Sequence, residues 1–463
     1  MRGDVVVIGS GPIGAVIARR FAEGGRVVTM LEAGPAISDP PGSHVRNQTR
    51  FQRDPDYFFA GIADKFTYFD AAAPPAGLPG ASTTAAVGGQ GALWTNNCPR
   101  PSTFEQWAAM PAPEWDHYLG EAERYLDVHD DTFTASVRQQ RIVERLRAPL
   151  AEAGREIRGQ PMAGRLLDSA TIHYVATHDV LADTGVTVQA GDVRRVVVEG
   201  SRVSAVELWS SELIDASVVV VAAGAFGAPI LLHRSGLRTP ALGTHITYHP
   251  VLFSQLVLDE RLCSGGDFDL PPRLWIPPSA EAPWNTMVLR DTCPAPSVPP
   301  DTDVPPNRLV EIQSFCPVNN HRDNTMTIGD DETVHFDVPL RDADRKRMEA
   351  VVADQHELAR HLGRFRTGVE PQWMDLGFAH VMGTCRMGDK DDGTCVTDGF
   401  GRVWGIDNLY LATVGLIPTP LAVNPTLTGA ALAIRTADHV LAKPVPPSRI
   451  RTDTGRISSL PTA

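Results

Sequence analysis

The chain opens with a pattern of apolar residues that predicts a strand, a helix and a second strand. Residues 4–8 are almost all apolar, as is typical of a buried parallel strand. From Pro12 to Glu23 the apolar residues recur three and four positions apart, on one face of a helix. Residues 26–31 form a second apolar run, which ends at Glu32. Together these segments predict a βαβ unit of about 30 residues.

The pattern changes character twice further along the chain. Helices are expected at 104–128, 136–153, from about Pro229, at 341–362 and at 425–441, and strands at 186–188, 193–198, 203–209 and 218–221. From about 250 to 340, separate strand-like segments at 252–258, 308–315 and 333–338 alternate with loops, of which 294–306 is rich in proline. This middle region favours an antiparallel sheet.

These elements predict an α/β fold with two domains. Residues 1–250 and 381–445 are expected to form a Rossmann-like nucleotide-binding domain that is discontinuous in sequence. Residues 251–380 are expected to form a second, α+β domain for substrate, with contributions from about 45–80, a stretch rich in proline, glycine and aromatics. The polar tail 446–463 is expected to be disordered.

Composition narrows the function classes. With 42 basic and 55 acidic residues the net charge is −13, which disfavours nucleic acid or an anionic membrane as a partner. The N-terminus lacks the pattern of a signal peptide, and no run of about 18 apolar residues predicts a membrane helix. The six cysteines are scattered without a Cys-x-x-Cys pair, so we expect neither a zinc site nor disulfides, and a cytoplasmic protein.

The turn after the first strand carries a dinucleotide-binding fingerprint, Gly9-Ser10-Gly11-Pro12-Ile13-Gly14. Its first glycine permits a tight turn, its second lets a pyrophosphate approach the helix N-terminus, and its third lets helix and strand pack closely. Pro12 and Ile13 begin the helix. Glu32 follows 18 residues after Gly14, where an acid accepts hydrogen bonds from a ribose. This unit by itself leaves both FAD and NAD open.

Three later segments resemble those of the glucose-methanol-choline (GMC) oxidoreductases. They are the strand, turn and helix of 218–232, the glycine-rich segment 87–97 (Val-Gly-Gly-Gln-Gly-Ala-Leu-Trp-Thr-Asn-Asn) and the C-terminal segment 408–428, in the family's order over essentially the whole chain. The resemblance implies the GMC fold and FAD as cofactor. It places the following residues beside FAD: Gly88, Gly89, Gly91, Trp94, Thr95, Asn96, Ala223, Gly224, Pro425 and Thr426.

Within that family the chain is most similar to the pyranose oxidases. The run 371–375, followed by His380 and by 383–388, looks like their active-site segment, and their catalytic histidine and asparagine fall on His380 and Asn424. Many of those enzymes bind FAD covalently through a histidine at the position that Leu93 occupies, so FAD is expected to be non-covalent. The chain also resembles bacterial relatives that oxidise C3 of glycosides, including C-glycosides.

The chemistry of alcohol oxidation suits this pair. Removal of a hydride from carbon requires removal of a proton from oxygen, and a neutral histidine near working pH is a suitable base. We assign His380 as the base and Asn424 as the group that orients the hydroxyl. Simpler roles remain open: His380 as a buried structural histidine, Asn424 as a cap of the helix that starts at Pro425, and Thr95 as a turn residue.

Other polar and aromatic residues are weaker candidates. The histidine pairs 173/178 and 245/249 have spacings that a metal accepts, but without a third ligand we expect structural roles and no metal. Trp275 and Trp284 suit sugar stacking, although a core role is favoured. Cys385, Arg50 and Arg53 have little to support a role in the site.

The sequence therefore predicts an FAD-dependent enzyme that oxidises a secondary ring hydroxyl of a glucopyranosyl group. The substrate is expected to be a sugar or glycoside, with C3 of a glycoside favoured, and the electron acceptor O2 or a quinone. Three alternatives stay open: a pyranose 2-oxidase acting on free glucose, an NAD-dependent dehydrogenase that uses the same fingerprint, and a flavoprotein without catalytic function.

Overall fold

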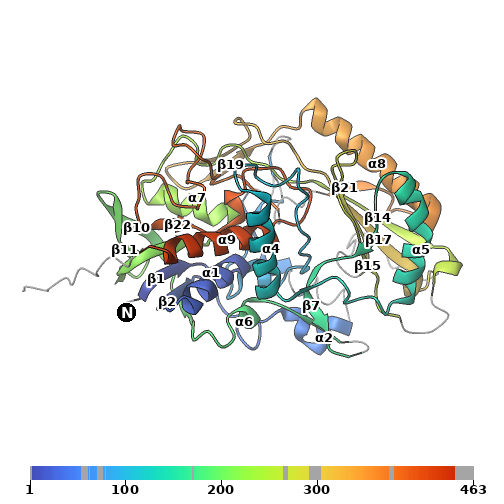
Figure 1. Ribbon diagram of the computed structural model, residues 1–463, viewed down its shortest axis with the longest axis horizontal. Helices are drawn as coiled ribbons and strands as arrows, with labels where there is room; N and C mark the ends of the chain where they lie inside the picture. Colours follow the sequence, from blue (N-terminus) through green and yellow to red (C-terminus); the bar gives the residue numbers. More distant parts are fainter. Residues whose placement is uncertain are drawn as a thin grey trace, which may run out of the picture.

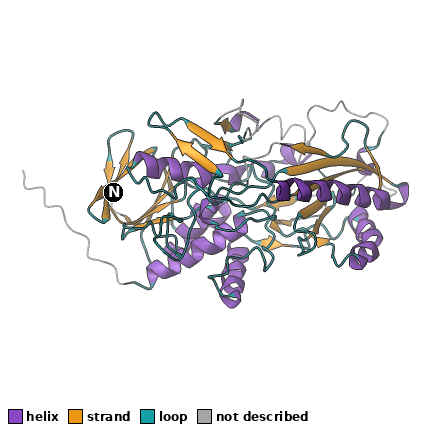
Figure 2. Cartoon of the chain, turned by 90° about the horizontal axis from the view of Figure 1, so that it is seen from above, coloured by secondary structure: helices purple, strands orange, loops and turns teal. Residues whose placement is uncertain are grey.

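The computed structural model describes most of the chain. The described residues are 3–53, 61, 63–69, 77–78, 80–168, 171–263, 269–290, 304–374 and 380–443. Much of the expected excursion at 45–80, most of the proline-rich loop 294–306 and the whole tail 446–463 lie outside them. The molecule is elongated, with the N-terminus and a parallel sheet at one end and α8 (Asp342–Leu362) at the other (Figure 1). Strands gather at both ends (Figure 2).

A five-stranded sheet forms the end that carries the N-terminus. Its order is β22-β13-β1-β2-β9, and all four pairings are parallel. The strands are β1 (Gly3–Ile8), β2 (Val28–Glu32), β9 (Val188–Ala190), β13 (Ala216–Val221) and β22 (Leu409–Leu411). The inner strands β1 and β13 are largely apolar because both faces of a parallel sheet are buried, whereas the edge strand β9 (Val-Gln-Ala) is partly exposed. The predicted βαβ unit is confirmed, with its helix at Pro12–Glu23.

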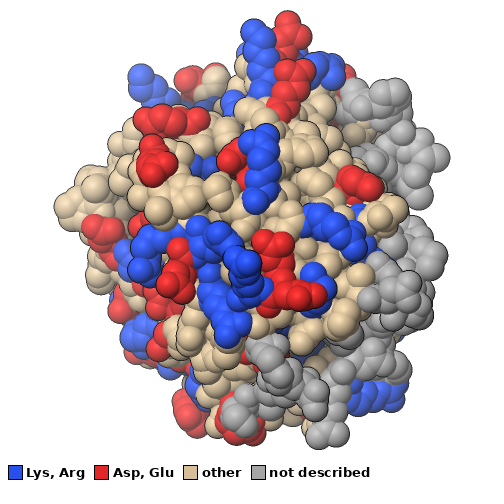
Figure 3. Space-filling view, turned by 90° about the vertical axis from the view of Figure 1, so that its right-hand side faces the viewer, with Lys and Arg blue, Asp and Glu red and all other residues tan. Residues whose placement is uncertain are grey.

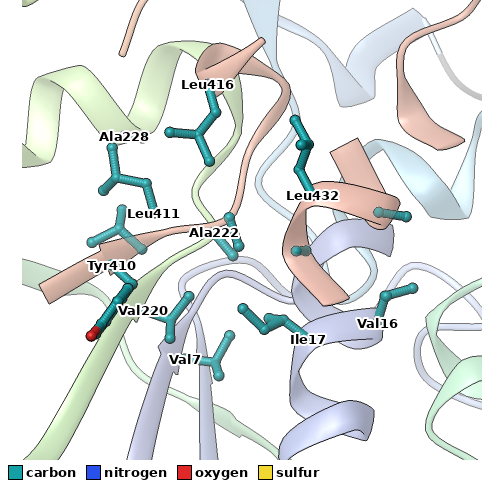
Figure 4. Packing of buried hydrophobic residues seen from close by; sticks show 14 of the residues in the cluster. Val7, Val16, Ile17, Val220, Ala222, Ala228, Tyr410, Leu411, Leu416 and Leu432 are labelled. Atoms are coloured by element: carbon teal, nitrogen blue, oxygen red, sulfur yellow. The ribbon is translucent and has the colours of Figure 1, made fainter. Parts of the chain in front are cut away.

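Helices pack around this sheet and close its core. They are α1 (Pro12–Glu23), α4 (Ala112–Tyr125), α7 (Gly224–Arg234) and α9 (Thr426–Leu441). Val7 of β1 and Val220 of β13 are fully buried, and they meet Ile17 of α1 and Ala228 of α7 in one apolar cluster (Figure 4). Helix α9 follows β22 after the short 3-10 helix Val414–Leu416 and packs against α1, so the C-terminal segment is held against the first βαβ unit.

An antiparallel sheet of seven strands forms the other end. Its order is β20-β14-β17-β16-β15-β6, and β21 also pairs with β14. The strands are β6 (Arg158–Gly159), β14 (Val251–Leu258), β15 (Arg273–Ile276), β16 (Asn285–Leu289), β17 (Leu309–Phe315), β20 (Gly363–Phe365) and β21 (Gln372–Met374). Helix α5 (Val137–Glu152) and helix α8 cover it with Leu146 and Leu358 in a shared core.

The elements α5 and β6 belong to this antiparallel layer although they precede residue 250. The expected range 1–250 for the nucleotide-binding part therefore contains a segment that packs with the second sheet. We propose that the substrate-binding part comprises residues 137–159 together with 251–374. The physical reason is that β6 extends the sheet at β15, and that Ile142 and Leu150 of α5 are buried against that sheet.

Smaller elements complete the structure. An antiparallel ribbon, β10 (Val193–Glu199), β11 (Arg202–Leu208) and β12 (Leu213–Ile214), lies beside α7. The remaining short elements are α2 (Thr49–Arg53), α6 (Thr177–Val180), β3 (Thr67–Tyr68), β4 (Ser82–Thr83), β5 (Val128–His129), β7 (Met162–Leu166), β8 (Ile172–Tyr174), β18 (Thr325–Ile328) and β19 (Val334–Asp337).

Helix α7 begins five residues earlier than the expected start at Pro229. Proline lacks an N–H, so it cannot donate to the carbonyl four residues before it, which belongs to Ala225. The hydroxyl of Thr384 donates to that carbonyl instead, at 2.6 Å. This side chain replaces the missing backbone bond, and the helix therefore continues through Pro229.

The surface at the end of the molecule that carries α5 and α8 has mixed charge. Basic and acidic side chains alternate over that face without separating into patches of one sign (Figure 3). Several of them form ion pairs along α8 and beside it, such as Arg360 with Glu357 and Arg341 with Asp323. The part of this face that the structure describes shows no stripe of positive charge that would attract a polyanion.

Candidate active site

A cavity of about 370 Å³ lies where the strands of the parallel sheet end. Ile8, Leu31 and Ala222, at or just after the carboxyl ends of β1, β2 and β13, line it together with Ala412 after β22. This edge is where open α/β sheets bind their ligands. Many residues predicted to bind the cofactor line the cavity: Gly9, Gly11, Pro12, Ile13, Gly14, Glu32, Gly89, Gly91, Trp94, Ala223, Gly224 and Thr426.

The glycine turn is shaped for a close approach by a ligand. Gly9 has φ +103°, and a Cβ there would lie 2.6 Å from the carbonyl oxygen of Ala222. A Cβ at Gly14 would lie 2.3 Å from the carbonyl oxygen of Gly9, but a Cβ at Gly11 would meet nothing within 4 Å. Gly11 caps α1 without a side-chain hydrogen bond. The space at Gly11 and the uncapped N–H groups of α1 therefore fit the pyrophosphate of a dinucleotide.

Glu32 lines the same cavity and is held by the turn. The backbone N–H and the hydroxyl of Ser10 donate to Glu32 Oε2 at 3.0 and 2.7 Å, and the N–H of Gly34 donates to Oε1 at 2.9 Å. A carboxylate has about four acceptor positions, so capacity for a ribose hydroxyl remains. The hydroxyl of Ser10 also accepts from the N–H of Gly88 at 2.9 Å, which joins the two glycine-rich segments.

The second glycine-rich segment packs directly on the first. A Cβ at Gly91 would lie 2.4 Å from Pro12 Cγ, so only glycine fits there. Leu93 is buried in a small apolar cluster with Val45. Trp94 lines the cavity, and its indole N–H donates to the carbonyl of Val175 at 3.1 Å. The glycine-rich segment that resembles the GMC family thus packs over the glycine turn that follows β1.

Four residues predicted to contact the cofactor lie outside the lining of this cavity. They are Gly88, Thr95, Asn96 and Pro425. The side-chain amide of Asn96 donates to the carbonyls of Ala163 and Val175, both at 2.7 Å, and thereby holds the segment on β7. The hydroxyl of Thr95 accepts from the side-chain amide of Asn97 at 3.3 Å. These contacts position the segment that carries Trp94.

The two predicted catalytic residues come together beside the cavity. The side-chain Nδ2 of Asn424 lies 3.3 Å from His380 Nε2, although 44 positions separate them in sequence. Val381, the residue after His380, lines the cavity, and so does Thr426, two positions after Asn424. The tertiary structure therefore brings a histidine and a carboxamide to the edge of the nucleotide site.

Asn424 does not cap the helix that follows. Helix α9 begins at Thr426, with Pro425 as its N-cap residue and no side-chain capping bond. The capping alternative is therefore wrong, because the amide of Asn424 is used on His380 instead. Its Oδ1 is buried and has no hydrogen-bond partner among the residues that the structure describes. Buried acceptors are rarely left unpaired in proteins, so this oxygen is suited to a ligand hydroxyl.

A second histidine, His249, touches the first. His249 Nε2 is hydrogen-bonded to His380 Nδ1, and His249 Nδ1 lies 2.9 Å from the carbonyl oxygen of Leu421. The ring of His249 stacks on Phe315, with centroids 4.6 Å apart and planes 6° apart. Burial lowers the pKa of His249 to about 4. Burial, and then the neighbouring His249, lower the pKa of His380 well below its usual value.

The weaker candidates have structural partners. Trp284 Nε1 donates to Asp354 of α8 at 2.8 Å, and Trp275 Nε1 donates to Asn285 of β16, so both indoles are buried and have structural partners. His173 is paired with Asp179 at 2.8 Å. Cys385 is buried, which raises the pKa of its thiol to about 12 and disfavours a nucleophilic thiolate. Arg50 is exposed and lies over Phe51, and the side chain of Arg53 lies outside the described residues, as does Asp375.

Two features of the described residues bear on other functions. Within them, no three His, Cys, Asp or Glu side chains are grouped so that they could hold a metal ion. None of the helices in the same part of the chain is both long and apolar enough to span a membrane.

Comparison with known proteins identifies the family. Family models for GMC oxidoreductases match residues 171–251 and 320–433. The chain is also 31% identical to a C-glycoside 3-oxidase of Microbacterium trichothecenolyticum, over 94% of this chain and 96% of that protein. The chain belongs to the GMC oxidoreductase family. It is therefore an oxidoreductase, and the resemblance inferred from its motifs is confirmed.

Further relatives of this GMC oxidoreductase agree with that assignment. A pyranose 2-oxidase of Tricholoma matsutake is 28% identical, over 95% of this chain and 93% of that protein. The crystal structure of pyridoxine 4-oxidase from Mesorbium loti superimposes with a TM-score of 0.65 at 19% identity, over 94% of this chain and 98% of that one. The expected α/β fold with an added antiparallel layer is thus confirmed.

The motifs of this GMC oxidoreductase do not reveal several residues of the site. His249 is the most important, because it contacts His380 across 131 positions of sequence. Its only local signal is its place just before a buried strand, and its spacing from His245 suggests only a pair of metal ligands. Arg234, which lines the cavity and pairs with Glu332, and Thr413, which lines it after β22, carry no motif of their own.

Proposed function

We propose that this GMC oxidoreductase binds FAD non-covalently and oxidises a secondary ring hydroxyl of a glucopyranosyl group, with O2 or a quinone as electron acceptor. A glycoside, oxidised at C3, is the favoured substrate. The observation that carries the proposal is the pair formed by His380 Nε2 and Asn424 Nδ2, 3.3 Å apart at the edge of a dinucleotide-shaped cavity. The 31% identical C-glycoside 3-oxidase supports a glycoside as substrate.

The residues that would hold FAD are those of the cavity. The N–H groups at the start of α1 face the space at Gly11 and suit the pyrophosphate, and Glu32 suits the ribose of the adenosine. Trp94 and Thr426 line the cavity among residues that suit the flavin. The leucine at position 93 cannot form a covalent bond to a flavin, and it is buried among apolar side chains. When bound, FAD would supply the group that accepts the hydride.

The protein's own part in the reaction is to bind the hydroxyl and to take its proton. His380 Nε2 would accept the proton of the substrate hydroxyl as general base. The lowered pKa of His380 keeps the imidazole neutral, and thus able to accept a proton, at neutral pH. Asn424 would hold the same hydroxyl through its unpaired Oδ1 or its Nδ2, which fixes the direction of the carbon–hydrogen bond.

The test is the visible spectrum of the purified protein, recorded without oxygen before and after addition of glucose or of a glucosyl flavonoid. We expect a flavin band that the glycoside bleaches and that glucose hardly changes, with a 3-keto product. Fast bleaching by glucose alone would instead support a pyranose 2-oxidase. A protein that shows no flavin band, even after FAD is supplied, would contradict the proposal and support use of a nicotinamide cofactor.

A further inference from the structure

His249 occupies a buried position that the proposed reaction does not use directly. The residue is 2% exposed and lies just before β14, packed face to face on Phe315. Its ring is tilted by 69° from that of His380, with centroids 4.5 Å apart. Both ring nitrogens of His249 have partners: the carbonyl of Leu421 on one side and His380 Nδ1 on the other. A buried imidazole whose two ring nitrogens both have hydrogen-bond partners can adopt only the tautomer that those partners allow.

The carbonyl oxygen of Leu421 determines which ring nitrogen of His249 carries the proton. A carbonyl oxygen only accepts hydrogen bonds, so the Nδ1 that lies 2.9 Å from it must carry a proton. Because burial keeps His249 neutral, its Nε2 is then unprotonated and can only accept. The partner of that Nε2 is His380 Nδ1, which must therefore be the protonated nitrogen of His380.

The proton on His380 Nδ1 determines the state of the nitrogen that faces Asn424. A neutral imidazole has one N–H, and in His380 it is used at Nδ1. His380 Nε2 therefore carries a lone pair, and Asn424 Nδ2, a donor, lies 3.3 Å from it. The chain of donors runs in one direction, from Asn424 to His380 to His249 to Leu421. A base that accepts a proton at Nε2 needs this tautomer and no other.

We propose that His249 is a positioning residue that holds His380 in the tautomer whose unprotonated Nε2 faces Asn424 and the substrate hydroxyl. The proposal rests on the proposed function, because this tautomer of His380 matters for the reaction only if His380 is the base. His249 itself is not proposed to contact the substrate. It acts through one hydrogen bond, which also becomes charge-assisted, and so stronger, once His380 has taken up a proton.

The carbonyl at the end of the chain is itself held in place. The N–H of Ala422, next to Leu421, donates to the buried carboxyl group of Glu105 at 2.5 Å, and the hydroxyl of Thr419 donates to the carbonyl of Glu105 at 2.6 Å. Burial raises the pKa of Glu105 to about 7. Two anchors on one short segment fix the acceptor on which the proton of His249 depends.

Among the described residues, burial and His249 lower the pKa of His380, and burial lowers that of His249. Apart from each other, the two imidazoles contact Phe315, the carbonyl of Leu421 and the side-chain amide of Asn424. The carboxyl group of Glu105 accepts from the N–H of Ala422, the residue after Leu421. The orientation of the protons is therefore set by hydrogen bonds.

Two substitutions separate the hydrogen bond from the packing. His249→Phe keeps a ring to stack on Phe315 but removes the acceptor for His380 Nδ1–H. His249→Gln loses the ring but keeps an amide oxygen that can accept that hydrogen. If the acceptor matters, the glutamine variant should be the more active of the two. If only the stacked ring matters, the phenylalanine variant should be the more active.

The kinetic measurement uses the FAD-loaded enzyme and its glycoside. In His249→Phe we expect kcat to fall by about tenfold to a hundredfold, the range for residues that orient a reactive group, with KM little changed. His249→Gln should recover most of kcat. A loss in His249→Gln equal to or greater than that in His249→Phe would overturn the proposal.

A second measurement is independent of activity. Nitrogen NMR of protein labelled with ¹⁵N-histidine distinguishes a protonated ring nitrogen from an unprotonated one, and His380→Ala assigns the signals. We expect His380 Nε2 to be unprotonated in the wild type and partly protonated in His249→Phe. An Nε2 that is protonated in the wild type, or unchanged in the variant, would refute the role of His249. Failure of every glycoside as substrate would contradict the proposed function and leave this NMR result intact.

Discussion

At the scale of single residues, the site depends on which nitrogen of one imidazole carries a proton. Two features make His380 suitable as a base: its contacts leave Nε2 unprotonated, and burial lowers its pKa. Lowering the pKa weakens the base but keeps it available at neutral pH. Asn424 contributes a donor and an unpaired acceptor at the same point. We propose that the pair thus combines proton transfer with orientation of the hydroxyl.

The first prediction at this scale concerns His380→Ala. Loss of the base should lower the rate of flavin reduction by at least about a hundredfold, the usual contribution of general base catalysis. FAD should stay bound, because His380 does not line the cavity. The measurement is stopped-flow reduction of the FAD-loaded variant, with the partly exposed His129→Ala as control. Full activity in His380→Ala would refute the assignment of the base.

The pH dependence of the same rate follows from the direction of the pKa shift. Protonation of His380 Nε2 removes the lone pair that the reaction needs. Because the pKa of His380 is lowered, the rate should be constant near neutral pH and decline only on the acid side, below the usual range for histidine. Stopped-flow reduction of the wild type across pH checks this, and a decline that begins above pH 7 would contradict it.

At the scale of elements, the active-site segment and helix α7 support each other. Thr384, four positions after His380, donates to the carbonyl of Ala225 that Pro229 leaves without a backbone partner. The first residues of α7, Gly224 and Ala225, line the cavity. One hydroxyl therefore completes a helix and ties it to the segment that carries the proposed base.

This contact predicts the effect of Thr384→Val. The change keeps the volume but leaves a buried carbonyl without a donor, which costs about 1–3 kcal/mol. We expect a lower unfolding midpoint and weaker binding of FAD, because the start of α7 lines the cavity. The matched control is Thr384→Ser, which keeps the hydroxyl. Equal midpoints and FAD affinities for the valine and serine variants would show that the hydroxyl has no such role.

At the scale of the whole molecule, the cavity gathers residues from nearly the full length of the chain. Its lining begins at Ile8 and ends at Thr426, and it includes the segments 82–85 and 191–193 between them. A ligand there would add contacts between parts of the chain that hydrogen bonds and packing already hold together. Such a ligand binds the folded state and not the unfolded one, so it stabilises the fold by mass action.

The corresponding prediction is that FAD can be removed and that its removal lowers stability. With leucine at position 93, acid precipitation should release all of the flavin into solution. Addition of free FAD at about a hundred times its Kd should raise the free energy of unfolding by about 2.7 kcal/mol. Flavin absorbance of the precipitate and the unfolding midpoint with and without FAD are the measurements. Flavin retained by the denatured protein would contradict non-covalent binding.

Much of the fold was predictable because its signals are local. The strand, glycine turn and helix of residues 4–23 depend on neighbours within a few positions, and the structure places α1 at the expected bounds. The start of α7 was not predictable in this way. Its extension before Pro229 depends on a hydroxyl that lies 159 positions away in sequence.

By itself, the sequence determined the family, the glycine turn that suits a nucleotide and the two polar residues proposed for catalysis. Each of these lies in a short motif, whose glycines and apolar periodicity depend only on neighbouring residues. Only the tertiary structure decided how those residues are used. The contacts from His380 to His249, from His249 to Leu421 and from Ala422 to Glu105 span 131, 172 and 317 positions. Hydrogen bonds over such separations are set by how two sheets and a C-terminal segment pack, and no local pattern encodes them.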